Sequence, residues 1–170
     1  MILVVEGTKQ SGKSTFIEEM KKLVKVPVIR LYDRDLLMFD VDQKSAQFAS
    51  CLSYVNAAIQ VDQALDGRCI IVHDRLHLSE LIYGKKVRNY ENENMWLVDK
   101  KLADYGAKGL LFLSENTKER LGYETYKEGY EKLSEVSAIE WFVINLDSTN
   151  GEISSSFLLK IMHTLLEEKV

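Results

Sequence analysis

The clearest chemical pattern in this sequence is the stretch VVEGTKQSGKSTF, which runs from Val4 to Phe16. It places two glycines, a lysine and a serine in the order G-x-x-x-x-G-K-S, the pattern of a phosphate-binding loop. In such a loop, backbone amides and a helix start attract phosphate oxygens, the lysine reaches the β and γ phosphates, and the serine binds Mg²⁺. The residues predicted to bind ATP are Gly7, Lys9, Gln10, Ser11, Gly12, Lys13, Ser14 and Thr15. The alternative for this stretch is a plain turn between a strand and a helix.

Two charged residues mark a second place where phosphate chemistry is expected. Asp74 ends the apolar run CIIVHD, and Arg75 follows it directly. An acid at the end of a buried strand can hold Mg²⁺ or one of its waters, so Ser14 and Asp74 are the predicted metal ligands. A helix cap is the alternative for Asp74. The guanidinium of Arg75 is predicted to clamp a phosphate, with a surface salt bridge as its alternative.

Short apolar runs alternate with helical patterns along the chain, which is typical of an α/β protein. The expected strands are residues 1–6, 26–32, 69–74, 109–113 and 141–146, and the expected helices begin at Lys13 or span 43–66, 95–105 and 157–166. The strands lack polar alternation, which indicates a parallel sheet covered on both faces. We therefore predict one domain over residues 1–170, with a three-layer P-loop NTPase fold and a five-stranded parallel sheet. Residues 31–43, 84–94 and 114–127 are expected as long polar loops on the ligand-binding side.

The composition sets limits on compartment and partners. The 170 residues carry a net charge of −4, which argues against a surface built for duplex DNA. Cys51 and Cys69 fit no metal or disulfide spacing and are expected to be reduced core residues. No apolar run is long enough to span a membrane, and the loop pattern begins too early to leave room for a signal peptide. We expect a cytoplasmic protein with no membrane partner, and both a monomer and a homodimer remain open.

The segments VEGTKQSGKST and ALDGRCIIVHDR, with the spacing that follows them, resemble the thymidylate kinase and deoxynucleotide kinase family of P-loop kinases. Members carry Asp-Arg at a strand end, a serine five residues beyond the aspartate, a tyrosine nine beyond and often an arginine fourteen beyond. The matching residues here are Asp74, Arg75, Ser79, Tyr83 and Arg88. The form DRLHLSELIYG is most similar to that of short members from bacteriophages and bacteria.

This resemblance implies a reaction and a set of roles. The γ-phosphoryl group of ATP would pass to a deoxynucleoside monophosphate with the help of Mg²⁺. Arg75 would hold the acceptor phosphate, Tyr83 would line the acceptor pocket, and Phe48 would stack on the base, unless Phe48 simply packs in the core. A lid around residues 114–128 would bring Arg120 to the transferring group, so the predicted catalytic residues are Lys13, Arg75 and Arg120.

The sequence departs from the family pattern at two positions, and these departures leave the acceptor open. Lys9 stands where members usually carry an acid, and Leu52 stands where they carry an arginine. One alternative is a kinase for a hydroxyl on a nucleoside, a modified base or a nucleic-acid 5′-end, with Asp33 or Asp35 as general base. With a monophosphate acceptor, Arg34 would instead meet substrate charge. A nucleotide-binding module with little catalysis is the other alternative.

Overall fold

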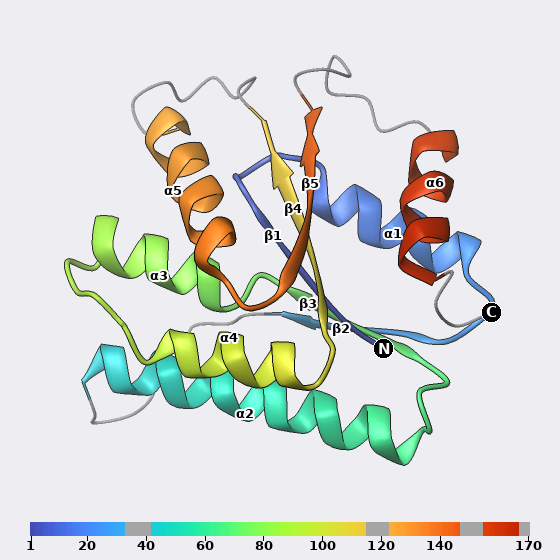
Figure 1. Ribbon diagram of the computed structural model, residues 1–170, viewed down its shortest axis with the longest axis horizontal. Coiled ribbons are helices and arrows are strands. Elements are labelled where there is room, and N and C mark those ends of the chain that lie inside the picture. The colour runs from blue at the N-terminus through green and yellow to red at the C-terminus, as the bar shows by residue number, and fades with distance from the viewer. Residues whose placement is uncertain (33–41, 115–122, 147–154, 167–170) are drawn as a thin grey trace.

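A five-stranded parallel sheet forms the centre of the computed structural model, which describes residues 1–32, 42–114, 123–146 and 155–166 (Figure 1). The strands are β1 (Ile2–Gly7), β2 (Val28–Tyr32), β3 (Ile70–Asp74), β4 (Lys108–Leu113) and β5 (Glu140–Asn145). They lie in the order β2-β3-β1-β4-β5, and every neighbouring pair is parallel. The predicted α/β class and parallel sheet are confirmed.

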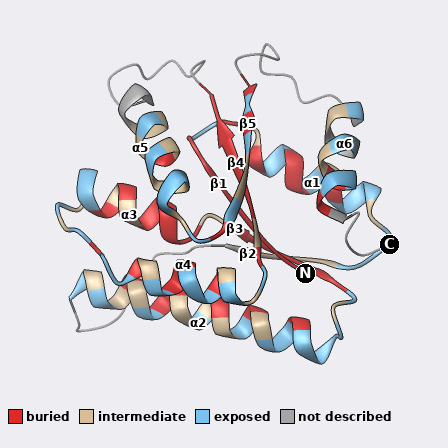
Figure 2. Ribbon diagram, in the orientation of Figure 1, coloured by how far each residue is buried: buried red, intermediate tan, exposed pale blue. Residues whose placement is uncertain are grey.

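Helices cover both faces of the sheet (Figure 1). On one face lie α1 (Lys13–Leu23) and α6 (Ser155–Leu166), and on the other lie α2 (Gln43–Ala64), α3 (His77–Lys86), α4 (Met95–Asp104) and α5 (Tyr123–Val136). Figure 2 shows that burial is concentrated in the central strands and the helix faces against them. In β1, Leu3 and Val5 pack toward α1, while Ile2 and Val4 pack toward α2 and α4. This arrangement explains why the strand has no polar alternation.

Two helices were not expected from the sequence. Residues 84–94 were predicted as a loop, yet α3 continues to Lys86. The predicted lid, residues 114–128, lies partly outside the described residues, and from Tyr123 onward it belongs to helix α5. The apolar signal of α5 is carried by Tyr126, Tyr130 and Leu133, which recur at helical spacing and pack against β4 and α3.

The start of α3 depends on a carboxylate that lies far away in the sequence. Oε1 of Glu6, at the end of β1, accepts hydrogen bonds from the backbone amides of Leu76 at 2.8 Å and Ser79 at 3.2 Å. These amides have no partner inside the helix, so the carboxylate acts as the cap that the local sequence does not supply. The end of β1 and the helix after β3 are thereby fixed to each other.

Two smaller sequence expectations can be compared with this fold. Cys51 and Cys69 are both buried and form no disulfide. In the part of the chain that the structure describes, no helix combines the length and apolar character needed to cross a membrane.

Candidate nucleotide-binding site

The loop between β1 and α1 is shaped by two glycines. Gly7 has φ of 130°, and a Cβ atom there would lie 1.9 Å from the carbonyl oxygen of Phe112 in β4. Only glycine permits this approach, which lets the amide of Thr8 donate to the same carbonyl at 3.0 Å. Gly12, with φ of 77°, then turns the chain into α1. Among the described residues, no side chain caps the first amides of α1, so these amides and the positive end of the helix dipole are available to an anion.

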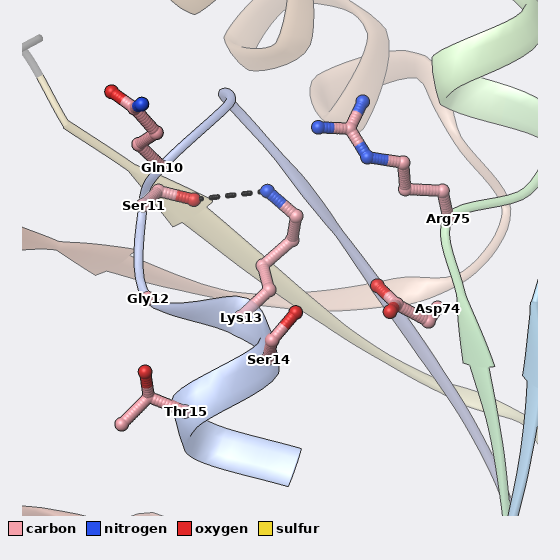
Figure 3. Close-up of a pocket in the computed structure, with 8 residues that line it drawn as sticks. All are labelled: Gln10, Ser11, Gly12, Lys13, Ser14, Thr15, Asp74 and Arg75. Carbon is pink, nitrogen blue, oxygen red and sulfur yellow. Dashed lines mark hydrogen bonds between the residues drawn. The ribbon is translucent and has the colours of Figure 1, made fainter.

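A pocket of about 480 Å³ opens beside this loop, a volume in the range of small-ligand sites. It is lined by Gln10, Ser11, Gly12, Lys13, Ser14, Thr15, Asp74 and Arg75 (Figure 3). The pocket thus brings together most of the residues that the sequence predicted for ATP and metal binding. Lys9 is exposed and is not among the lining residues, and Gly7 contributes through the backbone turn that starts the loop.

The ammonium group of Lys13 is buried at this pocket. Its Nζ atom donates to the carbonyl oxygen of Gly7 at 3.1 Å, to Oγ of Ser11 at 3.1 Å and to the carbonyl of Thr8. Burial, together with the nearby charge of Arg75, lowers the pKa of Lys13 from 10.5 to about 7. The site therefore disfavours the charged ammonium, and a bound anion would supply the countercharge that it lacks.

Arg75 approaches the pocket from the carboxyl end of β3. Its backbone amide donates to the carbonyl of Val5 at 2.9 Å, and its φ of 68° is uncommon for a residue with a side chain. The guanidinium donates to Oη of Tyr83 at 3.1 Å and lies 5.5 Å from the centre of the Tyr83 ring. Figure 3 shows Lys13 extending from the start of α1 and Arg75 from the end of β3 toward the same space. Two basic side chains from different elements therefore line one polar pocket.

Ser14 and Asp74, the predicted metal ligands, share one cationic partner. Nη2 of Arg30 donates to Oγ of Ser14 at 3.0 Å and also to Oδ2 of Asp74, and Nε of Arg30 donates to the same Asp74 oxygen at 3.1 Å. A single nitrogen thus bridges a hydroxyl and a carboxylate, which are oxygen donors of the kind that Mg²⁺ prefers. The two side chains fit a cation position between them.

Arg30 was not among the residues selected from the sequence. The sequence marks Arg30 only by its charge, which stands out in the otherwise apolar strand segment VPVIRLY. In the parallel register of β2 and β3, Arg30 lies beside Val72, so it is on the same face of the sheet as Asp74. From there its side chain reaches Ser14 at the start of α1. An arginine whose side chain is largely covered needs a partner, and its position one strand from Asp74 would have indicated which one.

A second buried network lies next to Arg75. Glu6 is fully buried, and its Oε2 accepts a hydrogen bond from Oγ of Ser79, which also contacts Oη of Tyr130 at 2.8 Å. Ser79, which the family pattern singles out, therefore joins β1 to α5 instead of lining the pocket. This network positions α3, the helix that carries Tyr83.

Other predicted residues lie away from the pocket or outside the described residues. Phe48, half-buried on α2, lines a separate groove between α2 and α4, together with Leu52. Arg88 donates to Glu80 and to Oη of Tyr90. Asp33, Arg34, Asp35 and Arg120 fall in segments that the structure does not describe. Among the described residues, no three His, Cys, Asp or Glu side chains form a further metal cluster.

Comparison with known proteins supports this fold. Neither a family model nor a curated protein sequence matches the chain. The YorR protein of Bacillus subtilis, crystallised in complex with phosphorylated GDP, superposes with a TM-score of 0.68 at 18% identity, over 98% of this chain and 96% of its own. Thymidylate kinase from Ehrlichia chaffeensis superposes with a TM-score of 0.59 at 14% identity, over 97% of this chain and 98% of its own. The chain therefore has a P-loop fold of the thymidylate and nucleotide kinase type.

Proposed function

We propose that this protein is a P-loop kinase that transfers the γ-phosphoryl group of ATP to the phosphate of a deoxynucleoside monophosphate. The observation that carries the proposal is the single pocket that joins the phosphate-binding loop to Lys13 and Arg75. A nucleoside triphosphate and a monophosphate both bring negative charge to the transfer site, so catalysis needs cations arranged in advance. The likeness in fold over nearly the whole length of a thymidylate kinase adds support.

The donor side of the proposed reaction uses the loop and the start of α1. The amides from Gln10 to Thr15 would bind the phosphate oxygens of ATP, and Lys13 would leave its loop carbonyls to reach the β and γ phosphates. Ser14 and Asp74 would hold Mg²⁺, which neutralises phosphate charge when it is bound. No covalent intermediate is required, because positioning and charge neutralisation carry the rate.

The acceptor side is assigned to Arg75. Its guanidinium can hold an acceptor phosphate with two parallel hydrogen bonds, and the contact with Tyr83 restricts its orientation. A monophosphate is already anionic, so this reaction needs no general base. Arg34 and Arg120 remain proposals from the sequence, the first for substrate charge and the second for the transferring phosphoryl group.

A labelling experiment tests the reaction. Purified protein would be incubated with Mg²⁺ and γ-labelled ATP, and with dTMP, dCMP, dAMP, dGMP, GMP, thymidine or a 5′-hydroxyl oligonucleotide in separate reactions. GMP and dGMP belong in the panel because the YorR protein was crystallised with phosphorylated GDP. We expect labelled nucleoside diphosphate from at least one monophosphate.

We propose that the reaction runs in the cytoplasm of a bacterium or an infected host, since it consumes ATP.

The same experiment separates the alternatives. Label on thymidine or the oligonucleotide alone would contradict the monophosphate reaction and favour a hydroxyl kinase with Asp33 or Asp35 as base. Tight ATP binding without any labelled acceptor would favour a nucleotide-binding module.

A further inference from the structure

Arg30 occupies the position between the two oxygens that the proposed function assigns to Mg²⁺. Its Nη2 atom donates to Oγ of Ser14 at 3.0 Å and to Oδ2 of Asp74, and Nε reinforces the contact with Asp74 at 3.1 Å. The side chain of Arg30 is only 9% exposed and that of Asp74 only 11% exposed. The positive charge at this point is therefore supplied by the chain itself.

Such a contact stabilises the site when no metal is bound. A nearly buried carboxylate without a cation would carry a large desolvation cost, and the guanidinium offsets it through two hydrogen bonds to one oxygen. The contact also connects β2, β3 and α1, because Arg30, Asp74 and Ser14 come from these three elements.

The same contact excludes a metal that uses both oxygens. Mg²⁺ binds oxygen ligands at about 2.0–2.1 Å in a nearly octahedral arrangement. A metal bound to Ser14 and Asp74 would stand where the Nη2 atom stands now, and two cations cannot share that position. Metal binding therefore requires the guanidinium of Arg30 to release both oxygens.

The structure also offers the released guanidinium another anion. Nη1 of Arg30 donates to Oε1 of Glu18 at 3.2 Å, and Glu18 lies one turn after Ser14 on α1 with a side chain that is 53% exposed. Arg30 can keep this contact while it leaves Ser14 and Asp74. The guanidinium therefore still has an anionic partner after a metal has displaced it.

We propose that Arg30 competes with Mg²⁺ for the oxygens of Ser14 and Asp74. This competition weakens the dependence of nucleotide binding on the metal. This inference rests on the proposed function, because it takes Ser14 and Asp74 as the ligands of a nucleotide-bound metal. By thermodynamic reciprocity, the more strongly Arg30 holds these oxygens, the less a metal can strengthen nucleotide binding. Arg30 acts here through the oxygens of Ser14 and Asp74.

Calorimetry on the purified full chain tests the competition without measuring turnover. The dissociation constant of ADP would be measured once with EDTA and once with excess Mg²⁺, and the ratio of the two constants gives the metal effect. For Arg30→Met we expect a metal effect about tenfold larger than for the wild type, within the usual range of coupling between sites. Arg68→Met is the matched control, because Arg68 is exposed and its Nε atom donates to the Leu65 carbonyl. The ratio for this variant should equal that of the wild type.

Two further variants make the outcome decisive. Asp74→Asn should reduce the metal effect while ADP still binds in EDTA, because the metal loses its charged ligand. Arg30→Lys, which keeps a positive charge but cannot bridge in the same way, should give a ratio between those of wild type and Arg30→Met. If circular dichroism shows that Arg30→Met does not fold, Arg30→Lys takes its place in the comparison.

Different results would overturn the competition by Arg30 and the kinase reaction. An unchanged or smaller metal effect in Arg30→Met and Arg30→Lys, with normal ADP binding in EDTA, would overturn the competition and leave the kinase proposal standing. A wild-type protein that binds no ADP under either condition would overturn both.

Discussion

The guanidinium of Arg75 donates a hydrogen bond to Oη of Tyr83 at 3.1 Å and lies against the face of the same ring. The Tyr83 ring in turn lies 5.4 Å, centre to centre, from the ring of Tyr126 on α5. A residue at the end of β3 is thus oriented by α3, and α3 is supported by α5. This arrangement separates the residue proposed to bind the acceptor from the residue that only orients it.

That separation predicts different kinetic effects for the two positions. Arg75→Gln should lower kcat/KM for the acceptor by about 100-fold or more, because it removes a charged donor aimed at phosphate. Tyr83→Phe keeps the ring and loses one hydrogen bond, so its effect should be about tenfold at most and fall on the acceptor KM. Steady-state rates at varied acceptor and saturating ATP measure both. Equal losses in the two variants would contradict this division of roles.

Lys13→Ala should abolish most phosphoryl transfer and leave the fold intact. We expect kcat to fall by about 100- to 1000-fold, the usual loss when one preorganised charge donor is removed. The thermal midpoint without nucleotide should stay the same or rise, because the variant no longer buries an ammonium group. Lys22→Ala is the control on the same helix, since Lys22 is exposed and pairs with Glu19. Near-normal transfer by Lys13→Ala would refute the assignment.

Gly7 and Gly129 should respond to alanine in opposite directions. In Gly7→Ala the new Cβ would meet the Phe112 carbonyl at 1.9 Å, so we expect a loss of about 3 kcal/mol or more in the free energy of unfolding, or no folded protein. Gly129 lies in α5, and in Gly129→Ala the new Cβ would lie 3.6 Å from Ile82 of α3, so the higher helix propensity of alanine should add up to about 1 kcal/mol. Urea unfolding measures both changes. Stabilisation of Gly7→Ala would show that β1 and β4 are not so close.

Asp99 predicts a pH dependence of stability. Burial opposes its ionisation, but hydrogen bonds from His77, Ser137 and the amide of Ala138 outweigh burial and lower the pKa of Asp99 below 3.8. A carboxyl whose pKa is lower in the folded state stabilises the protein above the unfolded pKa, and this contribution is lost as the pH falls.

Asp99→Asn should therefore lower the free energy of unfolding by about 1–3 kcal/mol at pH 7, and the difference from wild type should shrink as the pH drops below about 4. Chemical unfolding at several pH values provides the measurement. Glu93→Gln serves as the control, because Glu93 is exposed. A difference that stays constant down to pH 3 would contradict the ionised role of Asp99.

Substitution of Phe48 tests whether this side chain packs between helices or stacks on a base. Its place in the groove between α2 and α4, next to Leu52, predicts that Phe48→Ala lowers stability by about 1–3 kcal/mol and leaves the acceptor KM unchanged. Leu52→Ala should behave in the same way. A large rise in acceptor KM for Phe48→Ala alone, at unchanged stability, would instead support the stacking role that the family resemblance implies.

The elements that the sequence predicted well are those with local signals. The strand before Gly7 and the helix from Lys13 are set by an apolar run and by glycines that turn the chain, so their positions follow from nearby residues. Helix α3 was missed for two reasons. Its cap, Glu6, lies in β1, far away in the sequence. Buried polar residues such as Ser79 and Glu80 also interrupt the apolar spacing that would indicate a helix.

The site shows the same division between local and distant signals. The pocket residues from Gln10 to Thr15 follow one motif, and Asp74 and Arg75 follow the end of one strand. The role of Arg30 could not be predicted, because it depends on the register that sets β2 beside β3 and on the reach of a long side chain to α1. The position of Phe48 depends on how α2 rotates against α4, which helical spacing alone does not fix.

Residues 115–122 connect two positions that are each tied to the centre of the protein. At one end the amide of Ser114 donates to Oγ1 of Thr8 at 3.2 Å, and beyond the other end Tyr130 shares the hydroxyl of Ser79 with Glu6. Both anchors depend on the end of β1, because Glu6 belongs to that strand and Thr8 follows it directly. A substitution there would therefore disturb both flanks of this connection at once, together with the phosphate-binding loop that begins at the same place.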